Sequence, residues 1–310
     1  MLFLYIGLGL VGLTLLMFIV VSMIFGRMFF HISFDRRKGD KDFAKTENPN
    51  DKKRPSRIWF SEQKLEELSI ISKDKLCLKG YLLNQHSNKL AIILHGYRGR
   101  YYSSTAQAQF FFENGYDVLL PNNRAHDTSE GDYFTMGRRE VYDVLKWINL
   151  MVERNPNYQI VLMGISMGGH IIMMTAGRKE LQKNVKCFVE DCGYHSLKEI
   201  LFDNVKNSPR VKFPKYAFIC GEIYTGLFHH FSLNDSVKNS FKNVKIPGLF
   251  IHGDKDTYVP FENLDKNFNA MPEGIYKEKK AFAGVEHNRS VFVEPEYKDT
   301  IINFVNRFIK

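Results

Sequence analysis

Cysteine is scarce in this chain, and its spacing excludes the sites that cysteine usually builds. The 310 residues include 4 cysteines, which are Cys77, Cys187, Cys192 and Cys220. They form no Cys-x-x-Cys pair and no His-Cys metal spacing. Neither a zinc site nor a disulfide framework is therefore supported.

Internal repeats, low-complexity tracts and phosphate-binding glycine loops are also absent from the sequence. The composition, with 44% hydrophobic and 25% charged residues, is not that of a disordered or fibrous protein. A chain of this length can bury one large core or two small ones. We therefore expect a globular protein that uses no cofactor and no metal.

Charge is missing from one long stretch, residues 2–25. As a helix, these 24 residues would be about 36 Å long, against roughly 30 Å for the hydrocarbon core of a bilayer. A cleaved signal peptide is the competing interpretation, but the segment has no basic start, is too long, and has no small-x-small cleavage site before Arg27. The sequence predicts a retained transmembrane anchor over residues 1–26.

The net charge of +9 could indicate nucleic acid binding, but much of the excess lies directly after the anchor. The basic residues there are Arg27, Arg36, Arg37, Lys38, Lys41, Lys45, Lys52, Lys53, Arg54 and Arg57. They fit a juxtamembrane linker that faces anionic headgroups, with no role for nucleic acid. Because basic residues favour the cytoplasmic side, we expect the rest of the chain in the cytoplasm.

The remainder of the chain divides into a polar linker and one folded domain. Residues 27–57 form the basic linker, and the domain is expected over residues 58–310, with a helical cap inserted at about 196–243. Short apolar runs alternate with helical patterns, namely runs at 90–94, 116–120, 159–163, 185–189 and 248–251, and helices at about 105–113 and 138–154. An antiparallel hairpin is expected over residues 74–83. This alternation predicts a three-layer α/β fold with a mostly parallel sheet.

One motif carries the chemistry. Gly164, Ser166 and Gly168 form a Gly-x-Ser-x-Gly pattern between a predicted strand and a predicted helix. Such a nucleophile elbow lifts the serine hydroxyl above the sheet at a helix N-terminus. Ser166 is the candidate nucleophile.

A serine nucleophile needs a base, and the base needs an acid to orient it. The acid candidates, Asp254 and Asp256, follow the apolar run that ends at residue 251. The base candidate is His287, in a predicted loop before the last helix. This Ser-Asp-His order is the one used on α/β-hydrolase scaffolds.

With these motifs, residues 58–310 resemble an α/β hydrolase of the esterase, lipase and acyl-peptidase branch, and bacterial hydrolases with an N-terminal membrane helix. In that branch a Gly-Asp-x-Asp-x-x-Val-Pro motif uses its second Asp as the triad acid, which implies Asp256; Asp254 would cap the turn. The resemblance also implies that the backbone amides of Tyr97 and Met167 form the oxyanion hole. Residues 122–131 resemble the family's Arg-Gly-His-Gly-x-Ser loop, with Asp127 in place of the second Gly, and a structural role is expected there.

Two other candidate sites are disfavoured. Cys192 ends a predicted strand, but the elbow at Ser166 makes a thiol nucleophile improbable. His229 and His230 lack a third ligand at useful spacing, so a metal site is improbable.

The expected activity is acyl transfer to water, that is, hydrolysis of a carboxylic ester. A medium-chain acyl ester is the first expectation for the substrate, a lipid ester the second and a peptide amide the third. Aromatic residues of the cap could line an acyl pocket or form its core: Phe202, Phe213, Tyr216, Phe218, Tyr224, Phe228 and Phe231. Three alternatives stay open: an acyltransferase, a peptidase, and a non-catalytic binding module on the same fold.

Overall fold

The computed structural model describes residues 1–36, 54–209 and 211–310. The chain divides into two compact units. The first, which we call the helical unit, comprises residues 1–35 and 197–234; the second, the sheet unit, comprises residues 36–196 and 235–310. Of the predicted linker, residues 37–53 lie outside the described residues.

In the described part of the sheet unit, eight strands form one sheet in the order β1-β2-β4-β3-β5-β6-β7-β8. Strands β2 and β4 pair antiparallel, as do β1 and β2, and the other neighbours are parallel. The mostly parallel sheet that the sequence predicts is thus confirmed. The strands are β1 Leu65–Ile71, β2 Cys77–Leu83, β3 Lys89–Leu94, β4 Asp117–Pro121, β5 Gln159–Ile165, β6 Val185–Asp191, β7 Gly248–Gly253 and β8 Lys277–Phe282.

The opening hairpin begins earlier in the chain than predicted. Its strands are β1 and β2, and Ile71 lies opposite Cys77. The predicted first strand, residues 74–79, instead begins in the turn, where Lys75 has a φ of 67° and its N–H donates to the carbonyl of Ser72. The sequence pattern did not reveal this left-handed residue, so it placed the turn too late.

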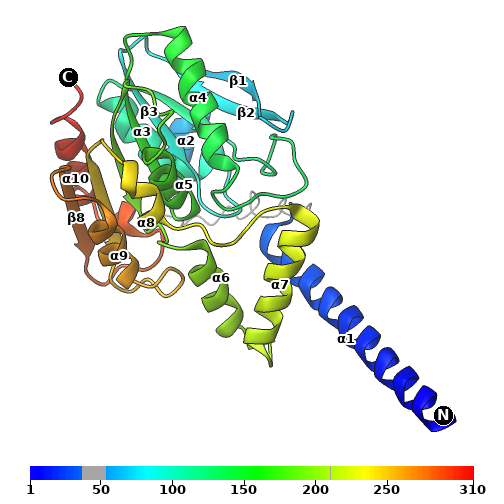
Figure 1. Ribbon diagram of the computed structural model, residues 1–310. Coiled ribbons are helices and arrows are strands. Elements are labelled where there is room, and N and C mark those ends of the chain that lie inside the picture. Colours follow the sequence, from blue (N-terminus) through cyan, green and yellow to red (C-terminus); the bar gives the residue numbers. More distant parts are fainter. Residues whose placement is uncertain (37–53, 210) are drawn as a thin grey trace. The chain divides into compact units, whose positions relative to one another are not determined.

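Helices cover both faces of the sheet, which makes three layers (Figure 1). Ala91 and Ile93 of β3 face α3 and α10, whereas their neighbours Leu90 and Ile92 are buried toward the opposite face. There, Trp147 of α4 lies over Gly80. The helices and short 3-10 turns of this unit are α2 Arg54–Ser61, η2 Tyr101–Ser104, α3 Thr105–Glu113, α4 Glu140–Arg154, α5 Met167–Ala176, α8 Val237–Ser240, η3 Phe241–Asn243, α9 Glu262–Ala270, η4 Ser290–Phe292 and α10 Glu296–Val305.

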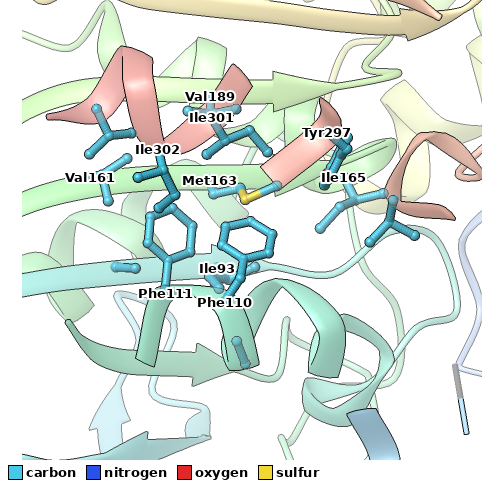
Figure 2. Packing of buried hydrophobic residues seen from close by; sticks show 14 of the residues in the cluster. Ile93, Phe110, Phe111, Val161, Met163, Ile165, Val189, Tyr297, Ile301 and Ile302 are labelled. Atoms are coloured by element: carbon cyan, nitrogen blue, oxygen red, sulfur yellow. The ribbon is translucent and has the colours of Figure 1, made fainter. Parts of the chain in front are cut away.

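The core between the sheet, α3 and α10 is aliphatic and aromatic. Figure 2 shows Phe110 and Phe111 of α3 facing Ile301 and Ile302 of α10 across side chains from the central strands. Phe60 of α2 belongs to the same cluster. Helix α2 thus packs on the core, and it includes residues that precede the predicted domain boundary at Ile58.

The helical unit consists of α1 Leu2–Phe34, α6 Leu197–Lys206 and α7 Pro214–His229. Helix α1 has a segment with mean hydropathy 2.6 and is long and apolar enough to cross a membrane. It continues past the expected boundary at residue 26, because Phe29, Phe30 and Phe34 are buried against aromatic residues of this unit. The first residues assigned to the linker are therefore helical.

The predicted cap, residues 196–243, is divided between the two units. Helices α6 and α7 belong to the helical unit, whereas α8 and η3 belong to the sheet unit. Phe241 is fully buried there beside Phe188 and Phe250. The cap helices proper therefore end before residue 235.

The core cluster generates a stability prediction. Replacing Phe111, which is fully buried, by Ala should lower the free energy of unfolding of the sheet unit by about 3–5 kcal/mol, through lost burial and the cavity left behind. The measurement is urea unfolding of the full chain in detergent, followed by near-UV circular dichroism. Phe112→Ala, one residue along the same helix and only partly buried, is the matched control and should cost clearly less. Equal losses for the two variants would contradict this description of the core.

Candidate active site

Ser166 occupies a strained turn between β5 and α5. Its φ of 55° and ψ of −116° lie in a region that residues with a side chain rarely adopt. Its N–H donates to the carbonyl of Asp191 at 2.8 Å, and its own carbonyl accepts the N–H of His170 at 3.1 Å. These two bonds hold the serine at the carboxyl ends of β5 and β6.

The glycines on either side of Ser166 are required by close backbone approach. A Cβ on Gly164 would overlap the carbonyl of Gly168, and a Cβ on Gly168 would overlap the carbonyl of Leu94 at the end of β3. Neither glycine has a positive φ. The pattern Gly-x-Ser-x-Gly is thus needed here for space, while the serine itself takes the left-handed conformation.

The structure brings Ser166, His287 and Asp256 into one line of contacts. His287 Nε2 lies 3.0 Å from Ser166 Oγ, and His287 Nδ1 lies 2.6 Å from Asp256 Oδ2. His287 follows β8, and Asp256 follows β7, so both side chains come from the carboxyl edge of the sheet. The three side chains predicted as nucleophile, base and acid are therefore at distances compatible with a hydrolytic triad.

Asp256, rather than Asp254, is the carboxylate beside His287. Asp254 accepts the N–H of Gly284 at 2.7 Å and so ties the β7 turn to the loop that carries His287. Asp256 Oδ1 accepts the N–H groups of Tyr258 and Val259, each at 2.9 Å. Burial alone would raise the pKa of Asp256, but hydrogen bonds from His252 and His287 lower it to about 2. Its carboxylate is therefore ionised and fixed in orientation.

His252 is the site residue that sequence reasoning missed. It ends β7, is fully buried, and its Nε2 lies 3.1 Å from Asp256 Oδ2 and 3.0 Å from the carbonyl of Val259. Both partners are acceptors, so Nε2 carries a proton. Burial would lower the pKa of His252, but the hydrogen bond with Asp256 and the charge of Glu190 raise it. The spacing His252–Asp256 after a buried strand was the available signal.

The two segments expected to form the oxyanion hole both lie beside Ser166. Gly96 is so near that an added Cβ would lie 3.8 Å from Ser166 Oγ. His95 holds this turn: its Nδ1 donates to the carbonyl of Gly96 at 2.8 Å, and its Nε2 accepts the N–H of Asn123 at 3.1 Å. Met167 is the first residue of α5, and the first amides of a helix have no partner within the helix.

The neighbouring loop keeps its turn despite the replaced glycine. Asp127 has a φ of 45°, a conformation that Asp tolerates better than most residues. Its carboxylate accepts a hydrogen bond from the Asn122 side chain at 3.2 Å, and Ser129 Oγ donates to the carbonyl of Asn122 at 2.8 Å. These contacts give the loop a structural role.

Cys192 lies near the triad but is unsuited to act as a nucleophile. Burial raises its pKa well above the usual range, so it is a thiol and not a thiolate. Potential ligand atoms of Cys192, Asp256 and His287 lie within 4.8 Å of one another. Among the described residues, these three form the group whose spacing could suit a metal ion. His229 and His230 are not part of it, and the ring of His229 stacks on Phe30 at 3.4 Å.

Comparison with known proteins agrees with the fold described above. Residues 90–218 match the family model described as the α/β hydrolase fold. The chain is 21% identical over 304 residues to the uncharacterized protein YqkD of Bacillus subtilis (strain 168). The alignment covers 96% of this chain and 95% of that protein.

Two solved structures are also similar to this chain. The esterase Pf2001 of Pyrococcus furiosus superposes with a TM-score of 0.66 and 24% identity, over 80% of this chain and 92% of the esterase. The acylaminoacyl peptidase of Pyrococcus horikoshii superposes with a TM-score of 0.57 and 18% identity, over 82% of this chain and 43% of the peptidase. With its family match, sheet order and elbow, the chain has the α/β-hydrolase fold.

Proposed function

We propose that this protein is a serine hydrolase that cleaves carboxylic esters and is held at a membrane by α1. The observation that carries the proposal is the continuous contact from Ser166 Oγ through the His287 ring to Asp256 Oδ2, at 3.0 Å and 2.6 Å. The esterase Pf2001 shares the fold at a TM-score of 0.66, which supports the same reaction class.

The reaction begins with proton transfer. His287 Nε2 accepts the Ser166 hydroxyl proton as the oxygen attacks the ester carbonyl, while ionised Asp256 stabilises the imidazolium that forms. The same proton then goes to the leaving alcohol. Water, deprotonated by His287, attacks the acyl-enzyme and releases the acid. Every step uses side chains of the chain and water.

The developing oxyanion needs hydrogen-bond donors that are already in place. The amides of Tyr97 and Met167 are the proposed donors. The N-terminal end of α5 adds a favourable partial positive charge at Met167. His95 contributes indirectly, because its two hydrogen bonds hold the turn that presents Tyr97.

The membrane part of the proposal rests on α1. Its described residues from Phe3 to Val20 are exposed apolar side chains or small residues, as expected for a surface that contacts lipid. The basic residues that follow favour the cytoplasmic side for the hydrolase. The proposed substrates are small or lipid-like esters.

A fluorophosphonate probe tests for an activated serine. The full chain in mild detergent should be labelled, and Ser166→Ala or His287→Ala should abolish labelling and lower the kcat for p-nitrophenyl butyrate by at least about 10³-fold. Asp256→Asn should lower kcat by up to about 10⁴-fold, since the base loses its orientation.

The control for the acid is Asp254→Asn, which changes the other carboxyl of the same turn and should retain most activity. Cys192→Ala should also retain labelling. A folded wild-type protein without labelling would overturn the proposal in favour of a binding module, and labelling of the Ser166→Ala variant would refute the nucleophile.

Peptide amides are the second candidate substrates, because the chain shares its fold with the Pyrococcus horikoshii acylaminoacyl peptidase at a TM-score of 0.57. A panel of p-nitrophenyl esters of increasing chain length, run beside acyl-peptide anilides, separates the two. We expect ester turnover to exceed amide turnover and to peak at medium chain length. The reverse order would identify a peptidase.

The ionised state of Asp256 has a consequence for stability. Its pKa falls from 3.8 to about 2 in the folded protein, which corresponds to about 2 kcal/mol of folding free energy. Because the folded pKa is the lower one, this contribution is complete above about pH 4 and is lost as the pH falls toward 2.

Urea unfolding of the wild type and of Asp256→Asn across this pH range measures the effect. We expect the difference in unfolding free energy between them to shrink by about 2 kcal/mol between pH 5 and pH 2. A difference that stays constant with pH would show that the Asp256 carboxylate contributes nothing through its charge.

A further inference from the structure

Helix α7 presents a row of large apolar side chains to solvent. Ile219, Ile223 and Leu227 are 53%, 54% and 61% exposed, and Phe213, just before the helix, is 72% exposed. The three aliphatic residues are spaced by four, so they form one stripe along the helix. We call these four residues the α7 stripe. Contiguous exposed apolar surface of this kind marks an interaction site.

The other faces of α7 are already occupied within the helical unit. Toward α1, an added Cβ on Gly221 would overlap the Phe29 ring, and one on Gly26 would meet the carbonyl of Cys220. Toward α6, Phe218 packs on Phe202 with ring centroids 5.4 Å apart. The stripe is therefore the face of α7 left over after both helices have packed.

The contacts with α1 fix the direction of α7. Tyr216, in its first turn, contacts Phe18, Phe25 and the hydroxyl of Ser22. Phe231, just beyond its end, contacts Phe34. Both helices thus point their N-terminal ends the same way, as Figure 1 shows for this unit.

The length of α1 then determines where α7 lies relative to the hydrocarbon core of the membrane. Its 33 residues extend about 50 Å, whereas a hydrocarbon core of roughly 30 Å takes about 20 of them. The first charged residue is Arg27, so the apolar segment that can lie in lipid ends just before it. Tyr216 contacts α1 within that segment, and the N-terminal half of α7 therefore lies at the membrane boundary.

Charges near this end of α7 suit an anionic lipid surface. Lys206, Lys212 and Lys215 are exposed around the α6–α7 connection. The acid nearest the stripe, Glu222, is paired with Lys198 at 2.7 Å. Basic side chains beside exposed apolar residues suit contact with an anionic lipid surface.

We propose that the N-terminal part of the α7 stripe, Phe213 and Ile219, inserts into the surface of the bilayer that α1 spans, while the long side chains of Lys212 and Lys215 reach its anionic phospholipid headgroups. Helix α7 is thereby a second membrane-contacting element. This inference rests on the membrane part of the proposed function, and it is independent of the serine chemistry.

Quenching by brominated lipid tests the proposal. In a Cys77→Ser background, whose remaining cysteines are buried, one cysteine introduced at Ile219, Ile223, Leu13 or Glu153 carries a bimane label. The full chain is reconstituted in phosphatidylcholine–phosphatidylglycerol vesicles with and without brominated acyl chains. Leu13, in α1, is the positive control, and Glu153, exposed at the end of α4, is the polar control. Fluorophosphonate labelling of each variant reports that its fold and active serine are retained.

The expected result is loss of fluorescence in brominated vesicles at Leu13 and Ile219, a smaller loss at Ile223, which lies at the level of Phe29 and Phe30, and none at Glu153. Quenching at Leu13 alone overturns the proposal and leaves the anchor intact. No quenching at any position overturns the anchor and the proposal together, while retained fluorophosphonate labelling leaves the hydrolase assignment standing. The bimane emission wavelength at Ile223 could instead shift as the protein-to-lipid ratio rises, without quenching. That result would indicate that the stripe contacts a second copy of the chain, and it would also overturn the proposal.

Discussion

The close approach of the β5–α5 turn to the end of β3 is the constraint on which the rest of the site depends. Any side chain at Gly164 or Gly168 would collide with backbone, so the turn is as tight as a polypeptide allows. That tightness forces Ser166 to a φ of 55°, and the hydroxyl then points out at the carboxyl edge of the sheet. In the proposed reaction, a serine that is positioned by its own backbone is already oriented for attack.

Asp256 provides the matching fixed point on the other side of the site. It receives two backbone amides and contacts two histidines, so removing any one partner would leave the carboxylate still held. His252 is buried behind it, and His287 lies in front, toward the serine. The parallel order β5-β6-β7-β8 brings these loops to one edge although they are far apart in sequence.

Much of this arrangement could be predicted from local patterns. Buried apolar runs marked β3 and β5, and the glycines around Ser166 marked the turn. Local patterns do not predict a structural feature that depends on a contact with residues far away in the sequence. Helix α1 runs past Arg27 because Phe29 and Phe34 pack on residues some two hundred positions later. His252 reads as an ordinary strand residue until the turn after β7 brings Asp256 back over it.

The cap aromatics show the same limit. Tyr216, Phe218 and Tyr224 contact rings of α1, an arrangement that composition alone could not distinguish from an acyl pocket. Their partners are in a segment that the sequence pattern treats as a separate anchor. In this protein, helix α1 and the cap helices α6 and α7 share one core.

Strand β8 lies at the edge of the sheet, and its exposed backbone groups could pair with another chain. Its sequence places Lys277, Lys279 and Lys280 along that edge. Lys277 donates to the carbonyls of Phe268 and Met271, Lys279 pairs with Asp265, and Lys280 pairs with Glu296. Charged residues on an edge strand of this kind disfavour pairing with a further strand and so protect the edge against β-aggregation.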